Sequence, residues 1–335
     1  MSKETVESKV RETAQELLSS GKIDLLIGFE KGSLPHCARP SFIRKAADTE
    51  KLVWNSWCAN NLAVYLPGLF EPRKPKKNEA APELPKVGII AKGCDTRSII
   101  NLVREHQIPR SNVVIVGVPC LGMLDAEKIK TKLEGDTAAE VTEEGGTVLI
   151  KGHAKTVAKK VKRDDIVFDT CIECRSPAPE NVDFLVSGSG RSASQKEHNR
   201  LKEIEGMPAK ERWDYFQSEI SQCIRCNACR QACPNCFCKE CFADQTNPRW
   251  IDAGDDVSDI ALFHIGRIFH QAGRCVECGA CSRACPMGID IQTFTKKIAF
   301  DVKDLYGFVP GFSSEELLPL STYKSDDKQD FITEP

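Results

Sequence analysis

Two stretches of the chain read CIRCNACRQACP (residues 223–234) and CVECGACSRACP (residues 275–286). Both follow the pattern C-x2-C-x2-C-x3-C-P, which is typical of the ligands of [4Fe–4S] clusters. Three thiolates spaced in this way can wrap three corners of one iron–sulfur cube, while the fourth cysteine precedes a proline that redirects the chain. The repeat therefore predicts two [4Fe–4S] clusters in this part of the sequence.

In two-cluster ferredoxins with this spacing, the fourth cysteine of each motif binds the other cluster. We therefore assign the ligands in crossed sets. Cluster 1 takes Cys223, Cys226, Cys229 and Cys285, and cluster 2 takes Cys275, Cys278, Cys281 and Cys233. The alternative is structural zinc, which usually takes two C-x2-C pairs, or cysteines with histidines, around one ion. A repeated set of three cysteines followed by Cys-Pro does not fit that pattern, so we favour clusters.

The composition of the whole chain narrows the class of protein. A length of 335 residues is enough for two domains, and a net charge of −2 gives no electrostatic signature of nucleic-acid binding. The chain has 17 cysteines, and residues 1–18 lack the continuous apolar core of a secretory signal. We therefore expect metal ligands in a reducing cytoplasm rather than disulfides. No apolar run approaches the length of a transmembrane segment, so no transmembrane segment is expected.

The first 190 residues predict an α/β domain with a mostly parallel sheet. An amphipathic helix is expected over residues 6–18. Strand-like apolar runs follow at residues 23–29, 52–54, 86–91, 113–118 and 166–168. Helical periodicity from about residue 96 separates two of these runs, which predicts a β-α-β unit with a right-handed crossover. Residues 143–147 predict a turn between two further short strands.

The remaining sequence predicts a mainly α-helical ferredoxin domain built around the two repeats. Helices are expected over residues 208–220, 255–271 and 289–302. The Gly/Ser-rich stretch from residue 188 marks the boundary before this domain. The expected organisation is an α/β domain at 1–190, a linker at 191–207, the ferredoxin domain at 208–312 and a polar tail at 313–335.

Six cysteines of the α/β domain stand at informative places, because most follow directly on a predicted strand or apolar run. They are Cys37, Cys58, Cys94, Cys120, Cys171 and Cys174. Loops at the carboxyl ends of parallel strands gather at one edge of a sheet, so these side chains are expected to converge. We predict a third [4Fe–4S] cluster held by Cys94, Cys120, Cys171 and Cys174, with Cys37 and Cys58 as alternates. The competing interpretation is that they are small buried apolar side chains.

Three more cysteines, Cys236, Cys238 and Cys241, follow the first repeat directly without completing a set of four. They are either further ligands, sharing a cysteine from elsewhere, or packing residues. His264 and His270 are expected to pack beside the clusters rather than to bind iron. The basic run at residues 159–163 is expected to be a solvated face. No dinucleotide-binding, phosphate-binding or nucleophile-elbow motif is present, so no catalytic residue is predicted.

Two resemblances carry these inferences further. Residues 208–300 resemble the α-helical ferredoxin domains of the succinate dehydrogenase iron–sulfur subunit and the heterodisulfide reductase C subunit, through both cysteine motifs and the sequence GRCVECGAC at 273–281. Residues 87–188 resemble the beta subunits of deazaflavin-reducing hydrogenases and formate dehydrogenases, through VGVPC at 116–120 and the C-x2-C pair at 171–174. Members of the second family bind flavin adenine dinucleotide (FAD) and a [4Fe–4S] cluster, which makes FAD a candidate cofactor here.

We therefore expect an iron–sulfur electron-transfer subunit of a cytoplasmic, multisubunit oxidoreductase of anaerobic metabolism. Its partners would be the other subunits of a hydrogenase, formate dehydrogenase or heterodisulfide-reductase-like complex. The alternative is a flavin-containing subunit whose N-terminal domain oxidises or reduces a soluble cofactor such as deazaflavin or NAD. A zinc-bound interaction module is the third interpretation.

Overall fold

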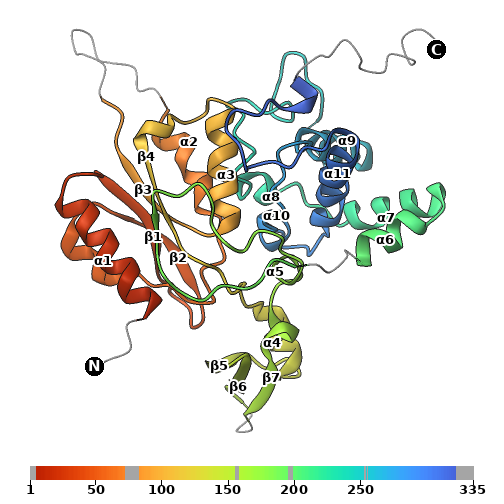
Figure 1. Ribbon diagram of the computed structural model, residues 1–335. Coiled ribbons are helices and arrows are strands. Elements are labelled where there is room, and N and C mark those ends of the chain that lie inside the picture. Colours follow the sequence, from red (N-terminus) through yellow and green to blue (C-terminus); the bar gives the residue numbers. More distant parts are fainter. Residues whose placement is uncertain are drawn as a thin grey trace.

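The structure is a computed structural model of the 335-residue chain, and it describes residues 5–71, 83–154, 158–194, 199–252, 254 and 256–321. An α/β half built on one sheet packs against a helical half, and a small second sheet projects from the molecule (Figure 1). The fold class expected from the sequence is thus confirmed. Most of the polar tail expected at 313–335 lies outside the described residues, as do residues 195–198 of the expected linker.

The main sheet has five strands in the order β2-β1-β3-β4-β8. Its strands are β1 (Leu25–Lys31), β2 (Ala38–Ile43), β3 (Val87–Ala91), β4 (Val113–Gly117) and β8 (Phe184–Leu185). The neighbours β1, β3, β4 and β8 pair in parallel, and only β2 runs antiparallel, at the edge. All residues of β3 are buried, as expected for a central parallel strand with both faces covered.

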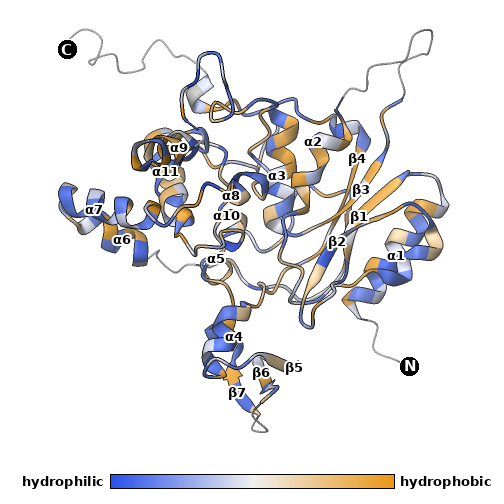
Figure 2. Cartoon of the chain, turned by 180° about the vertical axis from the view of Figure 1, so that it is seen from behind, coloured by the Kyte–Doolittle hydropathy of each residue, from blue (hydrophilic) through white to orange (hydrophobic). Residues whose placement is uncertain are grey.

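Successive strand residues point to opposite faces, so each strand supplies two apolar cores. The first core joins the sheet to α3 (Gly93–Arg104) and α2 (Leu66–Leu69), through Ile27, Ile89, Ile115, Ile99, Leu102 and Leu66. The second joins the opposite face to α1 (Val6–Ser19), through Leu26, Ile90, Val116, Val10, Ala14 and Leu17. Apolar colouring is concentrated along these strands and α3 (Figure 2). The carboxyl ends of the parallel strands therefore stand at a fixed edge between two rigid layers.

The second sheet is antiparallel, in the order β5-β6-β7. It contains β5 (Ala138–Glu144), β6 (Thr147–Gly152) and β7 (Lys159–Lys162), and packs with α4 (Ala126–Lys132) and α5 (Asp169–Ile172). Gly145 and Gly146 connect β5 to β6 with φ of 52° and 84°, which two-residue hairpin turns require. The turn expected at residues 143–147 is confirmed.

The helical half contains six helices in its described residues. They are α6 (Asn199–Gly206), α7 (Ala209–Ile220), α8 (Ala228–Gln231), α9 (Val257–His270), α10 (Ala280–Arg283) and α11 (Ile291–Tyr306). The three longer helices expected from the sequence are confirmed as α7, α9 and α11. The short helices α8 and α10 each carry the third cysteine of a repeat. No helix in the described part of the chain is both long and apolar enough to cross a bilayer.

Two strand predictions were wrong. Residues 52–54 form no strand, because a 3-10 helix runs to Lys51 and leaves Leu52 a single bridge to Glu30. Residues 166–168 form no strand either, because Ile166 ends a 3-10 helix and only Val167 makes a bridge, to Leu124. Within the expected linker at 191–207, the structure has helix α6.

Polar side chains of α3 fasten the two halves of the molecule together. Arg97 donates from Nε to the Pro310 carbonyl (3.0 Å) and from Nη1 to the Val276 carbonyl (3.2 Å). Asn101 donates from Nδ2 to the Arg274 carbonyl at 2.9 Å. The Arg274 guanidinium in turn pairs with Glu105, just beyond α3, at 2.6 Å. The second cysteine repeat is thus held against the helix that begins at the carboxyl end of β3.

Candidate metal centres

Both cysteine repeats adopt the same unusual loop. The residue before the second cysteine and the residue after it have positive φ in each repeat: Arg225 (51°) and Asn227 (59°), then Glu277 (60°) and Gly279 (69°). Left-handed residues at alternate positions form backbone concavities that favour anions. Three of the four are not glycine, and this conformation costs each of them on the order of 1–3 kcal/mol. The repeated strain indicates loops shaped to surround a bound anionic group.

Four cysteines line a cavity that we call the Cys223 cavity. They are Cys223, Cys226, Cys229 and Cys285. The first three come from the first repeat and the fourth from the end of the second repeat. The backbone N–H of Arg225 lies 3.4 Å from the Cys223 sulfur. The structure thus brings together the crossed set rather than the four cysteines of one motif.

The Cys275 cavity is the counterpart of this arrangement. It is lined by Cys275, Cys278, Cys281 and Cys233. Gln271, the residue after α9, also lines it, and the Cys233 thiol donates to Gln271 Oε1 at 3.6 Å. Cys229 and Cys281 are each buried on a short helix, and burial, with a smaller contribution from Cys281, raises the pKa of Cys229. Arg267 donates to the Cys229 carbonyl at 2.8 Å and also lines the Cys275 cavity. The two cavities are therefore neighbours.

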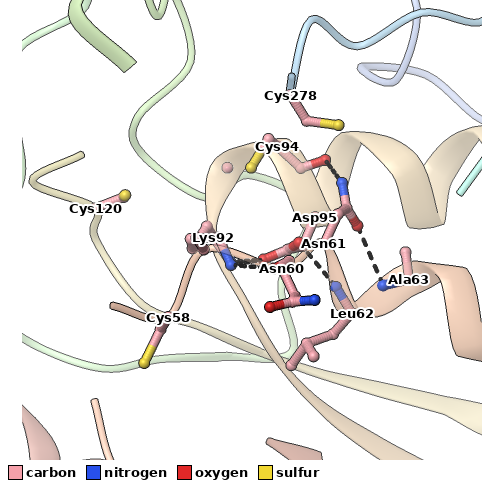
Figure 3. Close-up of polar contacts among 12 residues, drawn as sticks. Cys58, Asn60, Asn61, Leu62, Ala63, Lys92, Cys94, Asp95, Cys120 and Cys278 are labelled. Carbon is pink, nitrogen blue, oxygen red and sulfur yellow. Dashed lines mark hydrogen bonds and ion pairs between the residues drawn. The ribbon is translucent and has the colours of Figure 1, made fainter. Parts of the chain in front are cut away.

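A third set of cysteines converges at the edge of the main sheet, in the Cys94 cavity. Its cysteines are Cys94 at the start of α3, Cys120 beyond β4, Cys171 in α5 and Cys174 beyond α5. Cys278 of the second repeat also lines this cavity. Figure 3 shows Cys278 next to Cys94. One cysteine thus borders both the Cys275 cavity and the Cys94 cavity.

A buried ion pair supports the floor of the Cys94 cavity. Lys92 Nζ lies 2.9 Å from Asp95 Oδ2 and 2.9 Å from the Asn60 carbonyl, and both side chains are almost fully buried. Asp95 also accepts the backbone N–H groups of Lys92 (2.8 Å) and Leu62 (3.2 Å) (Figure 3). Burial opposes the charge on Lys92, but Asp95 outweighs it and raises the pKa of Lys92. A permanent cation therefore lies beneath these thiols.

Gly93 explains why the chain can close over this cavity. A Cβ atom at this position would overlap the Ser176 carbonyl oxygen and lie 2.8 Å from the Ala178 oxygen. The segment after Cys174 therefore packs directly on the start of α3. Only a residue without a side chain permits this approach.

The two alternates for the third cluster lie elsewhere. Cys37 is exposed and Cys58 is fully buried in the core, and neither lines the Cys94 cavity. The Cys58 thiol donates to the Val53 carbonyl at 3.8 Å, and burial raises its pKa to about 11. Cys58 fits the interpretation of a small buried apolar side chain.

Burial favours the protonated form of several thiols in these three cavities when no metal is bound. It raises the pKa of Cys120 and of Cys275 to about 12 and that of Cys229 to about 11. It also raises the pKa of Cys94 well above the ordinary value. A coordinating metal deprotonates a thiol outright, so these buried donors suit a group that brings its own positive charge.

The remaining residues singled out in the sequence fall in three places. Cys236, Cys238 and Cys241 line a fourth cavity, the Cys238 cavity, together with His270. His264 is buried beside the Cys223 cavity, and burial lowers its pKa to about 4. The basic run at 159–163 is a paired surface, with Lys159 on Glu134 and Arg163 on Glu143. In the described residues, no three His, Cys, Asp or Glu side chains are arranged to hold one metal ion.

Sequence reasoning missed the residues that connect the cavities. Arg283 donates from Nη1 to the Cys278 carbonyl (2.7 Å) and from Nη2 to the Ala59 carbonyl (2.9 Å), which joins the second repeat to the α/β half. Arg267 lies 2.8 Å from the Cys229 carbonyl and lines the Cys275 and Cys238 cavities. No sequence pattern marks these arginines. Only the Lys92–Asp95 pair has a spacing, three residues apart across the start of α3, from which its contact could be expected.

Comparison with known proteins agrees with this geometry. Residues 191–289 match the family model of the 4Fe-4S dicluster domain. The chain is 21% identical over 354 aligned positions to the F420-dependent formate dehydrogenase subunit beta of Methanocaldococcus jannaschii, covering 88% of this chain and 89% of that protein. It is 24% identical over 360 positions to the F420-dependent formate dehydrogenase 1 subunit beta of Methanococcus maripaludis, covering 89% of each.

Among solved structures, a chain of the F420-reducing [NiFe] hydrogenase complex from Methanosarcina barkeri aligns with 15% identity and a TM-score of 0.36. The alignment covers 52% of this chain and 64% of that one. The family match spans both cysteine repeats. The C-terminal half therefore contains a 4Fe-4S dicluster domain, with at least two [4Fe–4S] clusters as its cofactors.

Proposed function

We propose that this chain is an iron–sulfur electron-transfer subunit of a cytoplasmic oxidoreductase complex. The type of complex is that of the formate dehydrogenases to which its relatives belong by name. Its partners are then the catalytic subunits of that complex. The observation that carries the proposal is the position of Cys278, which borders both the Cys275 cavity of the ferredoxin domain and the Cys94 cavity of the α/β domain.

The proposal assigns three [4Fe–4S] clusters, each of which supplies one-electron transfer when bound. Their ligands are Cys223, Cys226, Cys229 and Cys285; Cys275, Cys278, Cys281 and Cys233; and Cys94, Cys120, Cys171 and Cys174. The donor sets fit these groups, because each provides four thiols around one cavity. The α/β domain at 1–190 then carries one cluster, and the ferredoxin domain at 208–312 carries two.

The cavities form a series through the molecule. The Cys94 cavity adjoins the Cys275 cavity through Cys278, and the Cys275 cavity adjoins the Cys223 cavity through Cys281 and Cys229. Arg267 and Lys92 place buried positive charge beside these thiols. Since reduction adds negative charge, both cations favour the reduced state.

The Cys223 cavity is the end of the series that opens outward. Cys226 is exposed, and the apolar side chains of Ile224 and Met287, which line the same cavity, are 59% and 40% exposed. Apolar surface around a redox centre favours close docking of a protein partner, because burying it on association is favourable. Electrons therefore enter or leave the chain at this surface.

Magnetic coupling between neighbouring clusters tests the series. The chain is purified anaerobically, and electron paramagnetic resonance (EPR) spectra are recorded during stepwise reduction. We expect the double variant Cys94→Ser/Cys120→Ser to lose about four irons per chain and the coupling signal between the Cys94 and Cys275 clusters. The control Cys58→Ser, a buried cysteine outside the cavity, keeps both. Unchanged iron content in the double variant would refute the assignment of the third cluster.

The relatives favour a second candidate function. Both are named for a dependence on F420, a deazaflavin, and they align along almost the whole chain. In this alternative the α/β domain binds FAD and exchanges electrons with the soluble deazaflavin. Release of one flavin per chain on acid treatment, with reduction of F420 by the chain, would establish this function. Iron–sulfur clusters without flavin would leave electron relay as the function of this subunit.

A further inference from the structure

Three of the five cysteines that the relay leaves unused line one cavity. Cys236, Cys238 and Cys241 line the Cys238 cavity, which has a volume of about 250 Å³. They occupy six consecutive positions in a C-x-C-x2-C pattern, and Cys238 and Cys241 form a two-residue-spaced pair of the kind that wraps one face of a cube. Three cysteines that line one cavity, next to two cluster cavities, are more than packing alone requires.

The lining of this cavity carries an excess of positive charge. Its permanent cations are Arg230, Lys239, Arg267 and Arg274, and it contains one carboxylate, Asp244. Arg230 pairs with Asp244 at 2.7 Å, and Arg274 pairs with Glu105 outside the cavity. The other two cations of the lining are Lys239 and Arg267, and neither has a carboxylate partner among the ion pairs of the described residues.

Arg267 supplies a second, independent observation. Its side chain is 3% exposed, and its Nε and Nη1 atoms have no hydrogen-bond partner. Asn235 Oδ1, in the same lining, is also buried without a partner. A buried guanidinium with unused donors is costly unless an anionic group accepts from it. Cluster-bound thiolates and sulfides are such acceptors.

Contacts to α9 and to the residues just after it hold the segment that carries the three cysteines in place. No helix or strand occurs in the described residues between α8 and α9, and loops of this length usually serve a function. Gln271 Nε2 lies 3.4 Å from the Cys236 sulfur, and Asn235 Nδ2 donates to the Arg274 carbonyl at 2.8 Å. The Phe242 ring packs edge-on against His270, with ring centroids 5.2 Å apart. The loop is thus fixed at one end of its cysteine run by Gln271 and Arg274, just beyond α9, and at the other end by His270 of α9.

We propose that Cys236, Cys238 and Cys241 bind an additional [4Fe–4S] cluster, with a ligand other than cysteine on the fourth iron. Arg267, Gln271 and Asn235 line both the Cys238 and Cys275 cavities, and Phe263 lines both the Cys238 and Cys223 cavities. The additional cluster therefore stands beside the relay and forms a side branch from it. A side branch gives the subunit a second place at which electrons can be stored or delivered.

Iron counting tests this proposal on the whole chain. Relative to the anaerobically purified wild type, the variant Cys238→Ser/Cys241→Ser should lose about four irons and four labile sulfides per chain. Its EPR signals from the Cys223 and Cys275 clusters should persist. The matched control Cys37→Ser removes an exposed cysteine that lines none of the four cavities and should lose no iron.

A second measurement needs no variant. Cys238 is exposed, so a free Cys238 thiol would react readily with iodoacetamide. The proposal expects Cys238 to stay unmodified in the iron-loaded native chain and to react after iron removal. Rapid alkylation of Cys238 in the iron-loaded chain, with unchanged iron in the double variant, would overturn it. That outcome leaves the relay intact, whereas a wild type without iron would refute the proposed function itself.

Discussion

Replacing Lys92 by methionine isolates the contribution of the buried ion pair beneath the Cys94 cavity. The substitution keeps most of the side-chain volume and removes Nζ with its contacts to Asp95 and the Asn60 carbonyl, each 2.9 Å long. Asp95 retains two backbone N–H donors but loses its counter-charge in a site with no solvent access. Leaving one buried partner uncompensated costs about 3–5 kcal/mol.

Hydrogen exchange measures this loss locally, which matters because a two-part chain with bound clusters need not unfold in one step. Amides of β3 and α3 should exchange roughly two to three and a half orders of magnitude faster, since each 1.4 kcal/mol is tenfold. The matched control is Lys51→Met. Lys51 pairs with Asp48 at the same sequence separation and at 2.7 Å, but on the surface, where a pair is worth about 0–1 kcal/mol.

A double substitution checks the cause. Lys92→Met with Asp95→Asn leaves no uncompensated charge, so exchange should slow again toward the wild-type rate. The reasoning is refuted if Lys92→Met accelerates exchange no more than Lys51→Met does, or if the double variant is less protected than the single one.

Three further predictions concern the cysteine cavities. Cys285→Ser should change the EPR signal of the Cys223 cluster and spare that of the Cys275 cluster; damage confined to the latter would overturn the crossed ligand sets. Gly93→Ala should destabilise the chain and lower its iron content, because the added Cβ overlaps the Ser176 carbonyl, whereas Gly68→Ala, with open space at its Cβ position, should do neither. Iron removal by a chelator should expose residues 223–291 to protease before the main sheet, since the apolar core there is small and includes Cys229 and Cys281; simultaneous cleavage of both halves would contradict this.

Much of this architecture follows from short-range sequence signals. The C-x2-C-x2-C-x3-C-P spacing predicted two neighbouring cavities with exchanged fourth cysteines, and the structure places these side chains in the same two groups. The β-α-β pattern predicted the parallel strands, and the carboxyl ends of β3 and β4 bring Cys94 and Cys120 together as the rule for open sheets requires. Cys171 reaches the same cavity from α5, which follows no strand of this sheet.

Other features depend on contacts between distant residues, which no local pattern records. Strand β2 has the sequence ARPSFI, which contains Pro40 and shows no apolar run. It forms because it pairs antiparallel with β1 at the edge of the sheet. The double position of Cys278 arises only when α3 docks on residues 273–276 through Arg97 and Asn101. Arg267 looks like any surface arginine on a helix, and only the packing of α9 against both repeats buries it.

The central claim is that three cysteine cavities in contact hold a continuous series of iron–sulfur clusters. Mössbauer spectroscopy of the ⁵⁷Fe-enriched chain, combined with iron and labile-sulfide analysis, tests it most directly. The account predicts about twelve irons per chain in [4Fe–4S] environments, and about sixteen if the Cys238 cavity is also filled. About eight irons or fewer, or stoichiometric zinc without labile sulfide, would contradict it.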